Sequence, residues 1–228
     1  MPEQTPRLLN HFAIYAFSES YWQLPVETRQ DMHRQWLAGL RDAAPAVHIY
    51  QVFPAQTQGD ILVWSAITAD QPCDTSRLFE GYARATNPYR GFIHLTDTLW
   101  GFTRPSQYTK TRSTREIDPF AATRKTYLVI YPFVKTTAWY LMSREARQGM
   151  MNEHIRIGKQ YEEIGQMLLY SFGVQDQEFV VVYEMDDLPL FSELVQELRS
   201  TEGRRYTERD TPLHSAIYHP AKETLALF

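Results

Sequence analysis

The sequence predicts an α+β protein made of two ferredoxin-like halves in one chain. First, runs rich in β-branched and aromatic residues, typical of strands, alternate with runs of helical periodicity. Second, this order of elements occurs twice. Third, the two copies match at a shift of 118 positions (145 minus 27), which superimposes Glu27 on Glu145, Arg29 on Arg147, Gln30 on Gln148, Met32 on Met150 and Trp36 on His154.

The first half is predicted to have the order strand, helix, strand, strand, helix. Its strands are expected at 9–17, 47–53 and 61–67, where apolar and β-branched residues dominate. Its helices are expected at 25–40 and 75–86. The two later strands are joined near a Gln-Gly-Asp turn, so the first half forms a small sheet with helices on one side.

The second half repeats this order. Strands are expected at 127–133, 167–172 and 178–183, and helices at 143–161 and 188–199. At the same shift of 118, the strand residues Ile-Leu-Val of the first half fall on Phe-Val-Val of the second. Two such units bury their free sheet faces by packing against each other or by forming one barrel.

These patterns divide the chain into three parts. Residues 1–105 form a structural half, residues 127–228 form the half that carries the site, and residues 106–126 connect them. The connecting segment is rich in Thr, Arg, Ser and Lys, has little periodicity, and is placed where it could cover a pocket.

Composition excludes several classes of function. A net charge of -4 with interspersed signs argues against a nucleic-acid surface, which needs a concentrated basic face. The single Cys73 cannot form an internal disulfide, which favours a reducing compartment. Because no apolar run reaches the roughly 18 residues of a membrane span, we expect a soluble cytoplasmic protein with no membrane partner.

His154 is the first candidate site residue. It shares one helix face with Ala146, Met150, Ile157 and Tyr161, and it replaces the tryptophan of the first half. One interpretation is a core histidine satisfied by a backbone carbonyl. The other is a metal ligand; because no second histidine or cysteine stands at ligand spacing on this helix, the metal would already be held by a macrocycle, as in haem.

Three runs resemble one known family. They are Met-Met-Asn-Glu-His at 150–154, the run from Ser171 to Phe179, and Leu-Arg-Ser-Thr-Glu at 198–202. Together they resemble the chlorite dismutase and coproheme decarboxylase family over residues 127–212. The resemblance implies a haem-binding dimeric α+β barrel that assembles as a homopentamer. It also implies that His154 is the metal ligand of the haem iron and that Glu202 accepts the far N–H of its imidazole.

The residue opposite the iron distinguishes activities within this family. Chlorite dismutases have an arginine seven residues before the conserved glycine, here Gly173, and this position is Gln166. A neutral amide cannot give an anion the forked cationic contact of arginine, so we expect chlorite decomposition to be weak or absent. Counting forward from His154 requires a gap of one residue; if that gap lies elsewhere, Met167 faces the iron instead.

A second motif is Tyr-Pro-Phe-Val-Lys, from Tyr131 to Lys135, which resembles the Tyr-Pro-Met-x-Lys of the decarboxylases. There the tyrosine forms a radical that removes hydrogen from a propionate. The resemblance therefore implies catalytic roles for Tyr131, Lys135 and Gln166. The alternative for Tyr131 is an ordinary aromatic strand residue.

The propionates need cationic or hydroxyl partners. The resemblance suggests Arg205 and Thr211 as cofactor contacts, and Trp139 with Tyr140 as an aromatic pair near the haem edge, for which core packing is the alternative. Further cationic candidates lie in the connecting segment, at Lys110, Arg112 and Arg115.

The sequence thus predicts peroxide-dependent decarboxylation of iron coproporphyrin III (coproheme) to haem b, with porphyrin and hydrogen peroxide as partners. Two alternatives stay open. One is a chlorite dismutase-like or peroxidase-like enzyme using haem b, and the other is a haem carrier or sensor.

Overall fold

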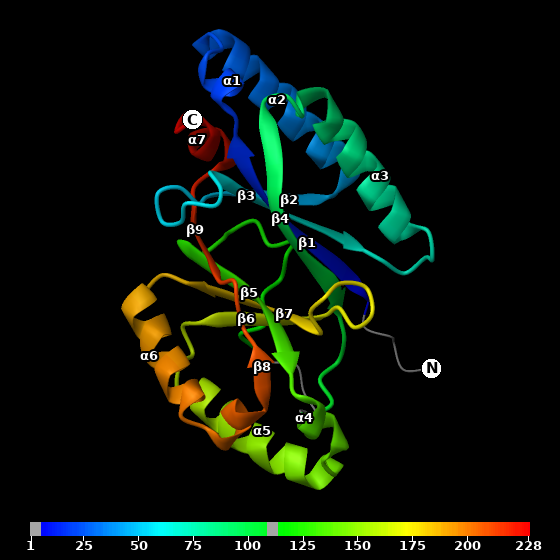
Figure 1. Cartoon of the computed structure of the whole chain (residues 1–228), viewed down its shortest axis with the longest axis vertical. Coiled ribbons are helices and arrows are strands. Elements are labelled where there is room, and N and C mark those ends of the chain that lie inside the picture. Colours follow the sequence, from blue (N-terminus) through cyan, green and yellow to red (C-terminus); the bar gives the residue numbers. More distant parts are fainter. Residues whose placement is uncertain (1–5, 109–113) are drawn as a thin grey trace.

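The computed structural model describes residues 6–108 and 114–228, and Figure 1 shows the two halves one above the other. The first half has the strands β1 (Leu8–Phe17), β2 (Ala46–Gln51), β3 (Ile61–Thr68) and β4 (Ile93–Thr103). Its helices are α1 (Glu19–Trp22), α2 (Val26–Ala43) and α3 (Asp74–Thr86), followed by the 3-10 turn η1 (Asn87–Tyr89).

The second half repeats the arrangement with strands β5 (Tyr127–Lys135), β6 (Gly165–Tyr170) and β7 (Phe179–Met185). Its helices are α4 (Thr137–Leu141), α5 (Arg144–Gly158) and α6 (Leu188–Arg199). The chain then forms η2 (Glu202–Tyr206), β8 (Thr207–Arg209), β9 (His214–Tyr218) and α7 (Ala221–Ala226), and α7 returns to the first half (Figure 1).

The strands form one antiparallel sheet in the order β7-β6-β4-β1-β3-β2-β9-β5-β8, and β5 also pairs with β7. This extra pairing joins two strands that are far apart in the order, so the pairings form a closed circuit. The predicted α+β class with ferredoxin-like halves is confirmed.

Three apolar cores follow from this arrangement. Leu9, Trp36 and their neighbours lie between the first-half strands and α2 and α3. A central core, with Phe12, Trp64 and Met167, receives side chains from both halves. The third core, with Val129 and Tyr183, lies between β5, β7 and the helices α5 and α6. Along β1, β3, β5 and β7, side chains alternate between the central core and a helix layer, as the pleat requires.

Two sequence predictions need correction. The strand β4 was not predicted, because its Thr, Asp and His side chains hide the alternation; it is held by pairing with β1 on one side and β6 on the other. The stripe on α5 was expected to be buried. Only Ile157 of that helix is buried, whereas Met150 and His154 are half-buried and Ala146 is exposed.

A buried ion pair ties the halves together through the connecting segment. The Arg124 guanidinium lies 3.6 Å from the Glu184 carboxylate, with both side chains less than one-tenth exposed. The Tyr50 hydroxyl of the first half donates to the same carboxylate at 3.1 Å. Burial raises the pKa of Glu184, and the charge of Arg124 opposes that rise. The carboxylate therefore depends on Arg124 for its charged form.

We expect Arg124→Met to lower the free energy of unfolding by about 3 kcal/mol, because it leaves a buried carboxylate without its cation. Urea denaturation measures the change. The control is Arg77→Met, which removes a 73% exposed arginine from a 3.9 Å pair with Asp74 and should cost less than about 0.5 kcal/mol. Equal effects of the two substitutions would contradict a structural role for the buried pair.

No helix within the described ranges is both long and apolar enough to span a bilayer.

Candidate functional site

The candidate site lies on the side of β5, β6 and β7 that faces α5 and α6, called here the helix side. Val129 and Tyr183 pack in the third core and define this side. Gln166 pairs directly with Tyr183, and directly opposed residues of paired strands share a face, so Gln166 also faces the helices. Met167 instead lies in the central core and is 4% exposed. Gln166 and Met167 thus lie on opposite faces of the sheet.

The backbone of Gln166 is fixed by the connecting segment. Its N–H donates to the carbonyl of Arg115 at 2.9 Å, and its carbonyl accepts from the N–H of Ile117 at 3.1 Å. The Arg115 guanidinium itself donates to the carbonyl of Tyr161, three residues after the end of α5. The segment therefore holds the strand that carries Gln166. Lys110 and Arg112 lie outside the described residues.

The helix layer of the second half is packed less tightly than that of the first. In the first half Trp36 is fully buried and meets Tyr15 edge-on at 5.1 Å. At the matching position in the second half stands the smaller, half-buried His154. On the same side of the sheet, Leu168 of β6 is 43% exposed. Leu168 therefore offers an exposed apolar surface on the helix side of the sheet.

The imidazole of His154 makes no hydrogen bond to any other described residue. Burial lowers its pKa to about 4; the charge of Lys135 lowers it further, and Glu153 opposes the shift. The ring is therefore neutral at physiological pH. A neutral imidazole with free nitrogens in a partly apolar setting is the form that binds a metal.

Lys135, at the end of β5, is near enough to His154 for its charge to lower the pKa of the imidazole. Its ammonium donates to the carbonyl of Gly203 at 3.2 Å and lies 4.3 Å from the ring centre of Trp139. Burial lowers the pKa of Lys135 to about 8, and Arg204 adds to that shift while Glu178 opposes it. The structure thus brings Lys135, Trp139 and His154 together.

Glu178 is a member of this region that sequence reasoning missed. It accepts the backbone N–H of Lys135 at 2.8 Å and the hydroxyl of Tyr140. It therefore fixes α4 against the ends of β5 and β7. Glu178 belongs to the run from Ser171 to Phe179 that resembles the family, but the sequence pattern does not indicate its hydrogen-bond partners.

Three predicted site residues lie at the protein surface: Glu202, the predicted partner of His154, and the predicted propionate contacts Arg205 and Thr211. The Glu202 carboxylate pairs with Arg205 at 3.3 Å, and both side chains are more than half exposed. The Glu202 N–H lies 3.4 Å from the Glu153 carboxylate, which ties η2 to α5. Thr211 is exposed. The structure shows neither a Glu202–His154 hydrogen bond nor Arg205 beside Lys135.

Arg204, rather than Arg205, shares the environment of Lys135. It pairs with Asp210 at 2.5 Å, and its charge acts on Lys135. The sequence offers two adjacent arginines, and the 3-10 turn η2 decides which of them faces inward. The sequence pattern alone does not distinguish the two arginines.

Tyr131 lies on the helix side, two residues beyond Val129 on β5. Its ring is stacked with Tyr183 at 6.3 Å between ring centres. Burial raises the pKa of Tyr131 well above its usual value; the interaction with Tyr183 and the charge of Asp210 add to the rise, and Arg199 opposes it. The phenol is therefore protonated and holds a transferable hydrogen atom.

These residues fit an iron porphyrin better than a bare metal ion. Across residues 6–108 and 114–228, no three His, Cys, Asp or Glu side chains are grouped to hold a metal. The donor set is one neutral imidazole, with an apolar sheet face opposite and cationic side chains nearby. A metal bound by a single protein ligand must be held mainly by a macrocycle.

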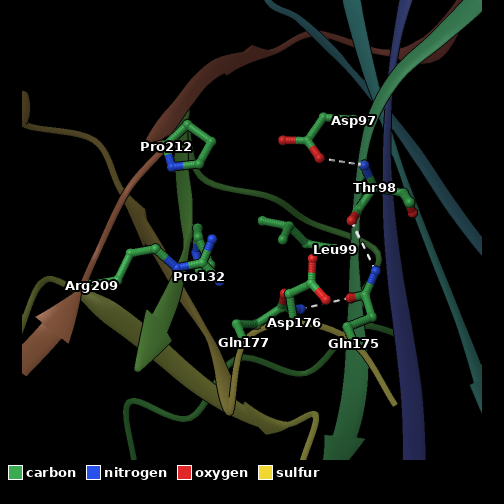
Figure 2. A pocket seen from close by; sticks show the side chains of 9 residues that line it. All are labelled: Asp97, Thr98, Leu99, Pro132, Gln175, Asp176, Gln177, Arg209 and Pro212. Carbon is green, nitrogen blue, oxygen red and sulfur yellow. Dashed lines mark hydrogen bonds between the residues drawn. The ribbon is translucent and has the colours of Figure 1, made fainter. Parts of the chain in front are cut away.

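A separate cavity of about 290 Å³ lies on the other side of β5 and is shown in Figure 2. Its polar groups are largely used by the protein itself. Asp97 pairs with His214 at 2.8 Å, and Gln175 accepts from the N–H of Trp100 and donates to the carbonyl of Thr98. None of the predicted site residues lines it; Asp97, Thr98, Leu99, Pro132, Gln175, Asp176, Gln177, Arg209 and Pro212 do.

The comparison with models of protein families shows to which family the chain belongs. The model described as chlorite dismutase matches residues 29–218, most of the chain. The chain belongs to the chlorite dismutase family. Among solved structures, a mutant chlorite dismutase of Candidatus Nitrospira defluvii covers 96% of this chain and 94% of its own, with a TM-score of 0.82 and 20% identity, which shows the shared fold.

Two curated relatives are named coproheme decarboxylase. The protein of Mycolicibacterium smegmatis is 27% identical over 169 residues, 72% of this chain and 69% of the relative. The protein of Staphylococcus carnosus is 28% identical over 177 residues, 73% of this chain and 70% of the relative.

Proposed function

We propose that this protein is an enzyme that converts coproheme to haem b with hydrogen peroxide as oxidant. The observation that carries the proposal is that Tyr131 and Gln166 lie on the helix side of the sheet, and that His154 of α5 makes no hydrogen bond to the described residues. The names of the two curated relatives support the same reaction.

The second half would hold the porphyrin while the first half supports it. His154 would bind the iron, and Glu202 would turn to accept the far N–H of its ring, exchanging its surface pairing with Arg205 for that bond. Lys135 and Trp139 would contact the porphyrin edge, and Arg205 and Thr211 would contact propionates at the rim. Gln166 would contact the ligand opposite the imidazole.

Iron porphyrin is substrate and cofactor together, and when bound it supplies the oxidising chemistry that peroxide drives. Each propionate reacts with one hydrogen peroxide to give a vinyl group, carbon dioxide and two water molecules, so atoms and electrons balance. Tyr131 would first give up its phenolic hydrogen to the peroxide-derived oxidant and then, as a phenoxyl radical, would take a hydrogen atom from the propionate side chain, which restores the phenol. Its pKa, which burial raises, keeps the phenol protonated before the reaction.

The test is to mix the purified protein with coproheme, add hydrogen peroxide in small steps, and follow the porphyrin by mass spectrometry. We expect stepwise loss of two carboxyl groups and formation of haem b. Tight binding without decarboxylation would overturn the enzyme assignment and favour a haem carrier or sensor. Absence of binding would also remove His154 as a ligand.

Chlorite decomposition is the second candidate, and the neutral Gln166 argues against it. We expect the unmodified protein loaded with haem b to decompose chlorite slowly, and Gln166→Arg to raise the rate about tenfold or more, because a guanidinium attracts the anion. Oxygen release measures it. The control is Gln160→Arg, an exposed position at the end of α5. Equal rates in both variants would show that position 166 does not face the ligand.

By the same resemblance we propose a cytoplasmic homopentamer. Sedimentation velocity of the haem-loaded protein tests the assembly, and a monomer would contradict it.

A further inference from the structure

Arg147 of α5 has a counterpart in the first half whose guanidinium already binds an oxygen atom. The helices α2 and α5 begin at Val26 and Arg144, which are 118 positions apart (144 minus 26). At the same shift, Arg29 of α2 corresponds to Arg147. The Nη1 atom of Arg29 donates to the main-chain oxygen of Phe228 at 2.5 Å. The first half therefore uses this helix position to bind an oxygen of its own chain.

The aromatic surroundings of this arginine also recur in the second half. The Arg29 guanidinium lies 5.5 Å from the ring centre of Tyr21 and 5.6 Å from that of Trp22. At the shift of 118 positions, Trp22 corresponds to Tyr140 (140 minus 22). Burial mainly raises the pKa of Tyr140, and the charge of Arg147 opposes that rise. The second-half arginine is thus close enough for its charge to act on the matching ring.

The two arginines differ in their hydrogen-bond partners. In both of them the Nε atom is buried without a hydrogen bond. Arg29 still binds an oxygen through Nη1, whereas Arg147 makes neither a side-chain hydrogen bond nor an ion pair with residues 6–108 and 114–228. The carboxylate of Glu178 is already held by the backbone N–H of Lys135 and by the Tyr140 hydroxyl. A partly buried guanidinium with no acceptor favours binding of an anion from outside the chain.

The position of Arg147 along α5 relates it to the proposed iron ligand. Arg147 precedes His154 by seven residues, which is about two helical turns or roughly 10.5 Å, so both lie on nearly the same helix face. A second cation lies on the facing sheet, where the Arg104 guanidinium is 5.3 Å from the ring centre of Tyr170. Tyr170 follows Gln166 by four residues on β6 and therefore shares its face. Both arginines thus belong to the helix side.

We propose that Arg147 binds a propionate carboxylate of the porphyrin and so gains the oxygen partner that Arg29 finds within its own chain. The role rests on the proposed function, in which His154 binds the iron of the same porphyrin. A carboxylate fits the planar fork of a guanidinium and accepts two N–H groups at once. The carboxylates lie at the edge of the porphyrin ring, away from the iron, as Arg147 lies along the helix from His154.

The test measures binding of iron-free coproporphyrin III, so that no bond to His154 contributes. Fluorescence anisotropy of the porphyrin follows its titration with the full chain. We expect Arg147→Gln to weaken binding about tenfold or more, the size of one charged hydrogen bond, and Arg147→Lys, which keeps the charge, to weaken it less. The thermal unfolding of both variants should match that of the parent, because the guanidinium makes no hydrogen bond to the described residues.

The matched control is Arg156→Gln, which removes the same charge from an exposed position of α5. Arg156 follows Arg147 by nine residues, which places it on the opposite face of the helix. Unchanged binding by Arg147→Gln, or an equal loss in Arg156→Gln, would overturn the proposal. If the parent does not bind the iron-free porphyrin, the same comparison is made with coproheme.

The outcome is independent of the reaction itself. If Arg147→Gln weakens binding while the parent forms no haem b with peroxide, the carboxylate site stands and the proposed reaction fails. If the parent forms haem b and Arg147→Gln binds the porphyrin as tightly as the parent, the reaction stands and the site fails.

Discussion

His154→Ala is expected to abolish iron coordination by the protein, seen as loss of the shift in the Soret band when coproheme is added. We expect affinity for the iron porphyrin to fall by more than about 100-fold. Removing even a hydrogen-bond partner of a metal ligand typically lowers metal affinity about 10- to 100-fold, and here the ligand itself is removed. The free protein should keep its stability, since the imidazole makes no hydrogen bond to the described residues. Absorption titration and thermal unfolding measure the two effects.

The matched control is His33→Ala in α2 of the first half. His33 is buried, and its pKa, like that of His154, is lowered to about 4, mainly by burial; unlike His154, its ring is hydrogen-bonded to the Tyr21 hydroxyl at 2.9 Å. We expect this variant to lose stability and to keep the Soret shift. An unaltered spectrum in His154→Ala would remove His154 as the ligand and with it the haem assignment.

Tyr131→Phe is expected to leave coproheme binding intact while vinyl formation falls by about 100-fold or more, equivalent to a barrier raised by ~2.7 kcal/mol. The phenylalanine keeps the ring that packs beside Tyr183 but has no hydroxyl hydrogen to transfer. Mass spectrometry of the porphyrin after peroxide addition measures the product, and absorption titration measures binding.

Tyr127→Phe provides the comparison, because Tyr127 lies on the same strand and the same side of the sheet and packs against the same core. It should decarboxylate at the parent rate. Full turnover by Tyr131→Phe would exclude Tyr131 as the reacting group, and equal loss in both variants would point to damaged packing.

Much of the fold could be predicted from the sequence. The helix α6 was predicted with its observed bounds, and the strands β1, β3, β5 and β7 were placed within two residues at each end. These elements have strong apolar periodicity that burial enforces. The strand β4 and the short strands β8 and β9 were missed, because pairing with distant strands holds them and their own side chains carry little signal.

The candidate site divides in the same way. His154 could be singled out because one helix occurs twice, with tryptophan in one copy and histidine in the other. Tyr131 and Lys135 could be named from their motif. Whether Gln166 or Met167 faces the helices could not be decided by counting, because a shift of one residue along a strand reverses the face. The pairing of Gln166 with Tyr183 decides it.

By itself, therefore, the sequence determined what is local and periodic: two α+β halves, their helices and main strands, and a histidine in place of a core tryptophan. Tertiary structure alone decided which side chains meet. It placed Arg204 rather than Arg205 beside Lys135, tied Glu178 to Lys135 and Tyr140, and set Tyr183 against Tyr131. These contacts join residues from different strands, turns and helices. Strand register and helix packing determine which residues touch, and short sequence patterns do not predict either of them.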